Sequence, residues 1–593
     1  MNHRLPCVIA FLVALLFYGF PGLSAAQQPN VVVLVVDDAG FSDFGAYGSE
    51  INTPHIDALA QRGKIFSNFH VSPVCAPTRA MLMTGVYSHR AGVGNLPETQ
   101  PIEHDGHHAY LGRLNNEVVT LAEMLGANGY RTYITGKWHL GHTPDTLPIA
   151  RGFDRSFILD ASGADNWQDR PYLPYYDRAP WFEGAHEASL PDDFYSSEFL
   201  VDRMIDYLNA DMGNDSPFFA YIGFLAVHMP VQAPREFTER YAGVYDHGWD
   251  AIRDARFQRV KELGLIPESA QLGPMPDGLT EWGSHSAKEQ AMLAKSMAVN
   301  AGMMEAMDYH IGRLVNYLRE IGEYDNTIFM VLSDNGPEPN RPTDHRLFKP
   351  WMKLVGYHRH YDTLGEKGSF VFMGPEFASA AASPGAFFKF YAGEGGLRVP
   401  LVVAGPGVNH GITHAFSFVT DVTPTLIELT GITPPTQANG RPLQTFDGRS
   451  LRPVLTGEAD AVYGPYDAVG MEALGHAALF RGDYKLMRNR PPKGDGRWYL
   501  YNIALDPGET HDLAEERPDL FAEMLEEYAA YKAYAGVLPV PDGYDPVRLF
   551  SHATHMRMIK RHGPWVLASV AAVIGLIIFS VLLRRRIKPG RKY

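Results

Sequence analysis

Cysteine is nearly absent from this sequence. The chain of 593 residues contains only Cys7 and Cys75, and this scarcity excludes a small domain held together by disulfide bonds. Basic residues are also in deficit, because 52 lysines and arginines stand against 67 acidic residues and leave a formal net charge of −15. A nucleic-acid-binding protein needs a positively charged face. We therefore expect no nucleic-acid partner.

The rest of the composition is that of an ordinary folded protein. Hydrophobic residues make up 45% of the chain and charged residues 20%, which argues against a disordered or collagen-like polypeptide. We find no internal repeat and no low-complexity tract. The length predicts more than one domain and a large buried core.

The first 26 residues have the order of a secretory signal peptide. His3 and Arg4 precede an apolar run at 6–17, and small residues at 24–26 provide a cleavage site. An uncleaved membrane anchor is the alternative. Export and cleavage would leave Cys75 as the single cysteine, and a single cysteine cannot form a disulfide within the chain.

A second apolar segment lies near the other end. Residues 565–583 carry no charge, and a helix of about 19 residues spans close to the hydrocarbon core of a bilayer. Basic residues crowd the segment 584–593 and favour the cytoplasmic side of a membrane. We therefore predict a transmembrane helix, a cytoplasmic tail, and a body outside the cytoplasm, on the periplasmic side in a bacterium. A buried core helix is the alternative.

Strand-like and helix-like segments alternate through most of the chain. Residues 30–36 form a β-branched run typical of a strand buried on both faces, and 53–63 form a helix with proline at its first position and a closing glycine. The alternation predicts an α/β fold with a large, mainly parallel central sheet. Further strands are expected at 130–135, 218–224, 327–332 and 401–404, and further helices at 118–129 and 292–321.

The pattern changes after about residue 460. Short strands at 477–480, 484–487 and 498–502 precede a helix at about 518–534. We interpret residues 461–535 as a small C-terminal α+β domain. Residues 536–564 are weakly periodic and are interpreted as a tether.

Two strands end in polar pairs. Asp37-Asp38 follows the strand at 30–36, and Asp334-Asn335 follows the strand at 327–332 and Ser333. Ligands of open α/β sheets bind at the carboxyl ends of strands, and these oxygens suit a hard cation such as Ca²⁺ or Mg²⁺. Either pair alone would more often be a turn or a helix cap.

Cys75 allows three interpretations. It can be a buried structural cysteine, or a nucleophile whose thiolate is favoured by a helix N-terminus and by Arg79. The third comes from its surroundings, since Cys75-x-Pro77-x-Arg79 resembles the signature of the type I sulfatases. In that family this cysteine is oxidised to formylglycine.

The resemblance extends over roughly residues 29–530 and is greatest to bacterial arylsulfatases. Other motifs of the family stand in its order: Asp37-Asp38, Thr135-Gly136-Lys137-Trp138-His139-Leu140-Gly141, Ala226-Val227-His228, Asp334-Asn335-Gly336, Gly393-Glu394-Gly395-Gly396-Leu397-Arg398-Val399-Pro400, and Leu500-Tyr501-Asn502 with Asp506-Pro507-Gly508-Glu509-Thr510. It implies an alkaline-phosphatase-like sandwich with a catalytic domain at 29–460. It also implies hydrolysis of sulfate monoesters, aryl sulfates above all.

The resemblance also implies roles for residues at the matching positions. The cation, Ca²⁺ with Mg²⁺ as the alternative, would be held by Asp37, Asp38, Asp334 and Asn335 together with the modified Cys75. A separate maturation enzyme would convert Cys75 to formylglycine. Arg79, Lys137 and Lys389 would be the cations facing sulfate, Lys389 being chosen for its spacing before Glu394. His139 would be the base and His228 the acid beside the leaving oxygen.

Substrate identity is poorly encoded. An aromatic-rich stretch at 167–182 and the segment 344–361 can line a cleft for aryl or sugar rings, or anchor loops to the body. Two other functions stay open. One is a phosphatase or phosphonate monoester hydrolase of the same superfamily, and the other is a membrane-tethered binding protein without activity.

Overall fold

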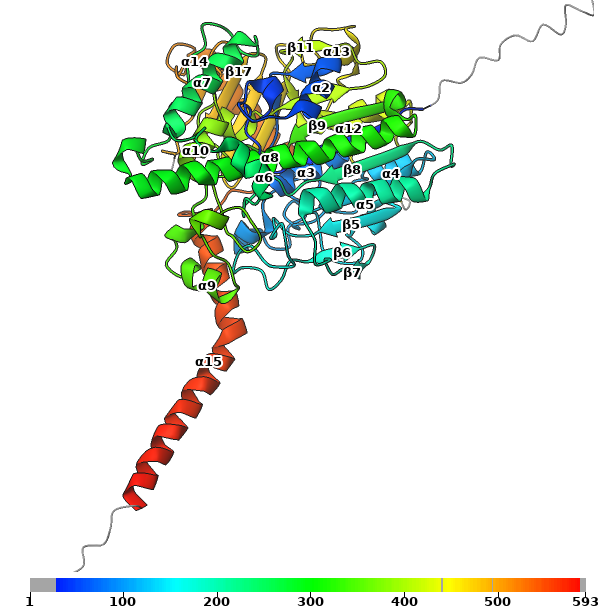
Figure 1. The fold of residues 1–593 in the computed structure, drawn as a ribbon. Helices are drawn as coiled ribbons and strands as arrows, with labels where there is room; N and C mark the ends of the chain where they lie inside the picture. The colour runs from blue at the N-terminus through cyan, green and yellow to red at the C-terminus, as the bar shows by residue number, and fades with distance from the viewer. Residues whose placement is uncertain (1–27, 439–440, 493, 587–593) are drawn as a thin grey trace, which may run out of the picture.

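The computed structural model describes residues 28–438, 441–492 and 494–586 (Figure 1). A ten-stranded sheet with the order β11-β2-β10-β9-β1-β8-β4-β5-β6-β7 forms its centre. Strands β9, β1, β8, β4 and β5 run parallel to one another, whereas β10 pairs with β9, β6 with β5, and β7 with β6 in antiparallel fashion. Its strands are β1 (Asn30–Val36), β2 (Lys64–Phe66), β4 (Arg131–Lys137), β5 (Arg155–Leu159), β6 (Trp181–Glu183), β7 (His186–Glu187), β8 (Phe218–Gly223), β9 (Thr327–Ser333), β10 (Leu401–Ala404) and β11 (Gly411–Thr413).

The central strand β1 is buried along its whole length because helices cover both faces of the sheet. Val31, Val33 and Val35 belong to one apolar core, whereas the intervening valines and Leu34 belong to the other. This is the alternation of side chains that a strand imposes. The continuous β-branched run therefore fills both cores at once.

The helices are divided between these two cores. The first core receives α3 (Cys75–Thr84), α4 (Leu121–Gly126), α12 (Val422–Thr430) and α13 (Arg452–Thr456). The second receives α2 (Pro54–Arg62), α5 (Ser196–Ala210), α7 (Gly248–Glu262), α8 (Ala287–Glu320) and α10 (Gly374–Ala381). The remaining short helices and strand pairs are α6 (Arg235–Thr238), α9 (Phe348–Leu354), α11 (Glu394–Leu397), β3 (Phe69–His70) with β12 (Ser417–Phe418), and β13 (Gln437–Ala438) with β14 (Arg441–Pro442).

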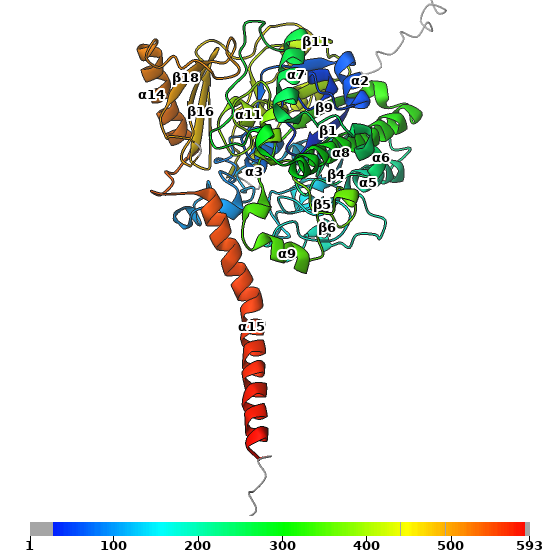
Figure 2. The ribbon, with the colours of Figure 1, turned by 60° about the vertical axis from the view of Figure 1, so that its left-hand side comes forward.

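A separate antiparallel sheet packs beside the large one (Figure 2). Helix α14 (Pro518–Ala535) lies against it, and its apolar residues join the first core. The strands of this sheet are β15 (Ala468–Ala473), β16 (His476–Arg481), β17 (Tyr484–Arg488) and β18 (Tyr499–Asn502). The mixed α/β fold and the small C-terminal sheet predicted from the sequence are confirmed.

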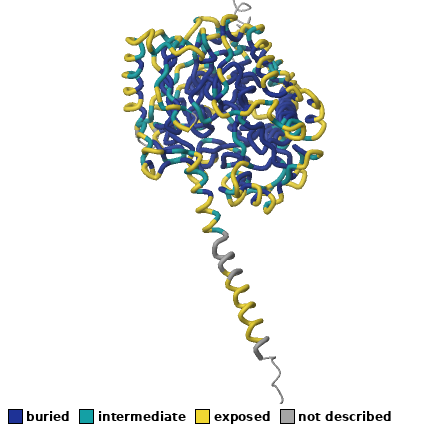
Figure 3. The backbone as a smooth tube through the Cα atoms, turned by 90° about the vertical axis from the view of Figure 1, so that its left-hand side faces the viewer, coloured by how far each residue is buried: buried dark blue, intermediate teal, exposed yellow. Residues whose placement is uncertain are grey.

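The C-terminal segment differs from its prediction. The stretch expected to be an irregular tether becomes helical at Pro546, where α15 (Pro546–Arg586) begins and extends away from the body (Figure 2). Its described outer residues are exposed (Figure 3). The helix was not predicted from the sequence because its first turns mix polar and apolar side chains and show little periodicity.

The predicted membrane anchor is wrong. Within the described part of the chain, no helix is long and apolar enough to cross a membrane. This finding also contradicts the predictions that depend on the anchor. These are the transmembrane helix at 565–583, the membrane as a partner, and the placement of the body and the tail on opposite sides of a membrane. The signal peptide predicted at 1–26 lies outside the described residues.

His476 makes the stability of the C-terminal sheet depend on pH. Its buried ring contacts Tyr391, and its Nδ1 accepts a hydrogen bond from the Arg490 backbone N–H at 3.2 Å. Burial and the charge of Arg490 lower its pKa from 6.5 to about 3. A depressed histidine pKa stabilises the fold above the unfolded pKa, and this stabilisation is lost as the pH falls from 6.5 towards 3.

We expect this group to cost about 2 kcal/mol of unfolding free energy at pH 5 relative to pH 8. Urea unfolding at the two pH values measures the difference. His476→Gln should reduce the loss on acidification, whereas His511→Gln, in which an exposed side chain is changed, should not. Equal pH dependence in both variants would contradict this assignment.

Candidate active site

The site is built where β1 and β9 end. The two strands are parallel, with Val36 opposite Ser333, so that Asp37 and Asp334 follow at the same edge of the sheet. Asp37, Asp38, Asp334 and Asn335 are all completely buried. Asp38 adopts a φ of 68°, a left-handed conformation that aspartate tolerates better than most residues. Two sequence-distant pairs thus form one cluster of oxygens.

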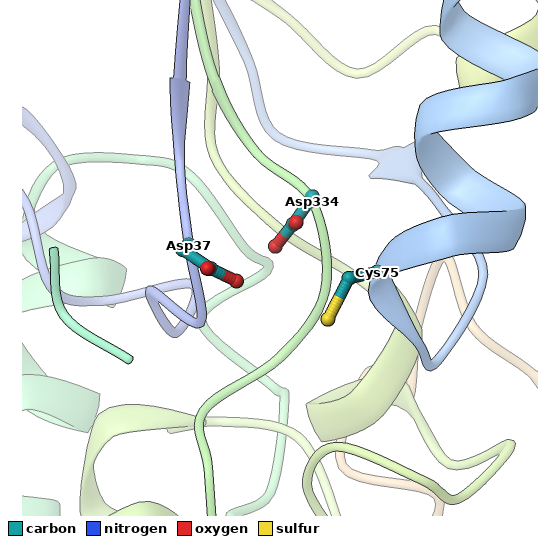
Figure 4. A group of neighbouring side chains, drawn as sticks. All are labelled: Asp37, Cys75 and Asp334. Atoms are coloured by element: carbon teal, nitrogen blue, oxygen red, sulfur yellow. The ribbon is translucent and has the colours of Figure 1, made fainter. Parts of the chain in front are cut away.

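Helix α3 brings Cys75 and Arg79 to this cluster. Cys75 is the first residue of the helix, and its sulfur and carboxylate oxygens of Asp37 and Asp334 all lie within 4.8 Å of one another (Figure 4). Arg79, one turn later, donates from Nε to Asp334 Oδ2 at 2.8 Å and from Nη1 to the Lys137 carbonyl at 2.8 Å. The guanidinium therefore connects α3 to the ends of β9 and β4.

Two lysines complete the cluster. Lys137, the last residue of β4, donates to Asp37 Oδ2 at 2.7 Å. Lys389 donates to Asp38 Oδ1 at 2.7 Å and to Glu338 Oε2 at 3.0 Å. The start of α11, directly after the loop of Lys389, can approach Gly336 because this residue lacks a side chain: a Cβ there would lie 2.0 Å from the Gly395 carbonyl oxygen.

The electrostatics of the cluster favour a further positive charge. Burial and then the charge of Asp334 raise the pKa of Asp37 to about 8, against the opposing effect of Lys137. For Asp38, burial also raises the pKa, but Lys389 and His228 outweigh it and the pKa is lowered. Carboxylates buried this close together repel one another, and a divalent cation relieves that repulsion.

Oxygen atoms without partners mark where such a cation fits. Asp37 Oδ1, Asp38 Oδ2 and Asn335 Oδ1 are buried, and no donor among the described residues reaches them. Buried acceptors are normally hydrogen-bonded, so three buried oxygen atoms without a donor in one cluster need an explanation. Carboxylate and amide oxygens are the ligands of Ca²⁺ and Mg²⁺. The residues present fit a hard divalent cation.

The thiol of Cys75 is poorly suited to ionise by itself. Burial raises its pKa to about 12, although Lys137 and Lys389 act in the opposite direction. The thiolate is the nucleophilic form of cysteine. This environment argues against the thiolate interpretation and leaves the structural and the modified cysteine.

The two predicted histidines lie in different surroundings. His228 follows β8, its Nε2 lies 3.8 Å from Asp38 Oδ2, and its Nδ1 lies 2.7 Å from the Met229 carbonyl oxygen. Burial lowers its pKa well below the ordinary value, and Asp38 opposes this effect. A neutral ring that donates from Nδ1 carries its lone pair on Nε2.

His139 lies beyond the end of β4, where the chain leaves the extended conformation with a φ of 59°. A strand would place the side chains at 137 and 139 on one face, but the chain is no longer extended at His139. Its Nε2 lies 3.5 Å from Glu98 Oε1. Burial raises the pKa of Glu98, but hydrogen bonding to His139 and the charge of His139 outweigh it, and the pKa falls to about 2.

Sequence reasoning missed Glu98 and Glu338. Glu98 lies in the short helix η2 (Pro97–Thr99) and accepts a hydrogen bond from Tyr176, whereas Glu338 pairs with Lys389. Both stand in irregular segments, outside any motif or periodic pattern. These two residues could be identified only from their contacts in the folded chain, Glu98 with His139 and Glu338 with Lys389.

The aromatic stretch serves two purposes. Trp181 lies in β6 and is buried in the second core, so it anchors the chain to the body. Tyr172 and Tyr176 share the Ser162 hydroxyl, and the Tyr172 ring contacts that of His228 at a centroid distance of 5.2 Å. This part of the stretch belongs to the site.

Comparisons with known proteins agree on one family. A family model described as Sulfatase matches residues 29–432. A sulfatase of Schizosaccharomyces pombe, itself uncharacterised, is 35% identical over 89% of this chain and 98% of its own length. The arylsulfatase of Klebsiella aerogenes is 35% identical over 76% of this chain and 96% of its own length. The crystal structure of Ps i-CgsB in complex with k-i-k-neocarrahexaose has a TM-score of 0.61 at 23% identity, covering 85% of this chain and 93% of that chain.

The buried oxygen atoms without donors, on Asp37, Asp38 and Asn335, predict a bound metal ion. Elemental analysis of purified protein should find about one divalent ion per chain, held by carboxylate oxygens. Asp37→Asn should lower this content and the melting temperature, because the hard cation loses a charged ligand and binding to the folded state stabilises it. Asp325→Asn, which removes a carboxylate on a side chain that is 95% exposed, is the control. Equal metal content in the two variants would refute the site.

Proposed function

The chain belongs to the sulfatase family, whose members hydrolyse sulfuric esters, and on that premise we propose that its substrates are aryl sulfates. In this proposal Cys75 is converted to formylglycine, and a divalent cation, Ca²⁺ or Mg²⁺, is held by Asp37, Asp38, Asp334 and Asn335. The observation that carries it is the position of Cys75, whose sulfur lies within 4.8 Å of the Asp37 and Asp334 carboxylates.

Formylglycine at position 75 would supply a hydrated aldehyde, with one hydroxyl to attack sulfur and a second that permits sulfate to leave. The protein's own residues would position the ester and balance its charge. Lys137 and Lys389 are fixed by Asp37 and Asp38, and such preorganised cations stabilise charge that develops in a transition state. Arg79 is already committed to Asp334 and to the Lys137 carbonyl, so we assign it a positioning role.

The two histidines would divide the proton transfers. His139 faces the Glu98 carboxylate at 3.5 Å, and a carboxylate partner can orient an imidazole that acts as a base. His228 is held neutral with its lone pair on Nε2. It would first take up a proton, which the negative charge of a bound ester favours, and then donate it to the leaving oxygen.

Similarity to the arylsulfatase of Klebsiella aerogenes supports aryl sulfate as the substrate. Other similar proteins are named for carbohydrate sulfates, such as the N-acetylgalactosamine-6-sulfatase of Rattus norvegicus, 31% identical over 42% of this chain. Nitrophenyl sulfate, nitrophenyl phosphate and N-acetylgalactosamine 6-sulfate, assayed side by side, separate the three substrate classes. Fastest turnover of either of the other two would refute the proposed substrate.

Mass spectrometry tests the modification of Cys75. Trypsin should release the peptide Ile65–Arg79, which contains no internal lysine or arginine. In active protein the sulfur of Cys75 should be replaced by an aldehyde oxygen, and an aldehyde-reactive probe should label the peptide. Cys75→Ser should fold and lose turnover, because a serine sulfate ester has no second hydroxyl for release. Full activity with an unmodified thiol would rule out formylglycine.

Glu98→Gln tests the partner of His139. We expect kcat to fall by roughly 10-fold or more, because a catalytic imidazole loses its orienting carboxylate. Glu103→Gln, at an exposed position in the following turn, should leave kcat unchanged. An unaltered kcat in Glu98→Gln would exclude this role.

A further inference from the structure

The C-terminal segment 537–561 lies across a loop that carries part of the site. The Tyr544 hydroxyl donates to the Thr99 carbonyl oxygen at 2.9 Å. His104 Nε2 lies 3.0 Å from the Pro539 carbonyl oxygen, and the Leu538 backbone N–H donates to the Tyr110 hydroxyl at 3.1 Å. These contacts fix the loop at 95–110, in which Glu98 stands.

The start of α15 holds a second loop, residues 160–180 between β5 and β6. Phe550 stacks on Tyr175 with a centroid distance of 5.2 Å. The Arg557 guanidinium lies 3.9 Å from the centre of the Tyr175 ring, and its Nη2 donates to the Tyr175 hydroxyl at 2.9 Å. Arg561 forms an ion pair with Asp177. Aromatic stacking and a cation over an aromatic face each stabilise such a contact.

Apolar packing extends this contact towards the site. Phe550 and Met558 pack against an apolar cluster that contains Tyr172 and Met229. Met229 directly follows His228, and the Tyr172 ring contacts the His228 ring. One face of the start of α15 is therefore continuous with the walls of the site.

The two loops meet at the site itself. Tyr176, from the second loop, donates its hydroxyl to Glu98 in the first. Glu98 in turn faces His139 at 3.5 Å. The first loop offers short helical turns and the second offers no regular element at all, so neither loop is held in the large sheet at this point.

We propose that residues 537–561 form a strap that positions Glu98 and Tyr176, and through them His139, for sulfate ester hydrolysis. This inference rests on the proposed function for its catalytic consequence. Tyr544, Phe550, Arg557 and Met558 are positioning residues, because none of them touches the reacting atoms. Small displacements of a catalytic group are costly: a misplacement of about 1 Å can reduce a rate by about 100-fold.

The same helix provides matched controls. Met556 and Ile559 are 52% and 62% exposed. Arg557 and Lys560 are both exposed, but the Arg557 guanidinium contacts Tyr175. The full chain should be made as Phe550→Ala/Met558→Ala against Met556→Ala/Ile559→Ala, and as Arg557→Met against Lys560→Met. In each pair the first variant, called docked-face, removes contacts to the loops, and the second, called exposed-face, removes the same kind of group from an exposed position.

Three measurements decide the proposal. Docked-face variants should lower kcat on nitrophenyl sulfate on the order of 10-fold, with a smaller change in KM, whereas exposed-face variants should match wild type. Hydrogen exchange should accelerate in segments 95–110 and 172–177. His139, which is 5% exposed, should react faster with diethyl pyrocarbonate. Phe550→Leu should restore most of the activity that Phe550→Ala loses.

The strap is overturned if docked-face and exposed-face variants have the same exchange rates in these segments. It is also overturned if the loops open while kcat and His139 reactivity stay at the control values. A wild-type protein without activity on aryl sulfate would instead contradict the proposed substrate. Loop exchange and His139 reactivity still support or overturn the strap in that case, because neither depends on turnover.

Discussion

The parallel pairing of β1 with β9 places four buried oxygen-bearing side chains at one edge of the sheet, and the rest of the site is organised around their charge. Burying charges is costly unless they are paired. Arg79, Lys137 and Lys389 each reach one of the carboxylates, and Glu338 joins through Lys389. Four carboxylates thus face three cations. The oxygens left without partners are where a divalent ion would complete the compensation.

The small C-terminal sheet contributes to the same arrangement from outside. Lys485 of β17 is buried and donates to Glu394 and to Glu509. Glu394 also pairs with His70 and Arg398, and its backbone N–H donates to Glu509. Because Glu394 begins α11, directly after the loop that carries Lys389, this buried network anchors that loop. The C-terminal sheet therefore supports the site without supplying a residue that touches the cluster.

Sequence alone predicted the features that depend on local pattern. The run of valines in β1 identifies a strand buried on both faces, and polar pairs after two such strands identify the sheet edge. The Cys75 motif identified the family. By contrast, Glu98 and Glu338 stand in loops, where no periodicity marks a buried carboxylate. The antiparallel direction of β10 was equally invisible, because a strand's composition does not encode the direction of its neighbour.

The ends of the chain were the least predictable part. Uncharged residues at 565–583 indicated a membrane span, and that prediction is wrong for the described chain. Segment 536–564 showed weak periodicity because the start of α15 docks only a narrow face, formed by Phe550, Arg557 and Met558. The docking of this face depends on the aromatic side chain that it contacts. That side chain, Tyr175, lies 382 residues before Arg557 in the sequence, so the local pattern of the segment gives no sign of the contact.

In the proposed mechanism the two histidines would carry out opposite proton transfers, and their surroundings differ. His139 faces the Glu98 carboxylate at 3.5 Å, and the pKa of this carboxylate is lowered. His228 is buried, and its Nδ1 is held by a backbone carbonyl, which favours the neutral ring. Two histidines in such different surroundings suit different steps of a reaction. Tyr172 and Tyr176 join these environments through Ser162, so a change in the loop that carries them would affect both histidines together.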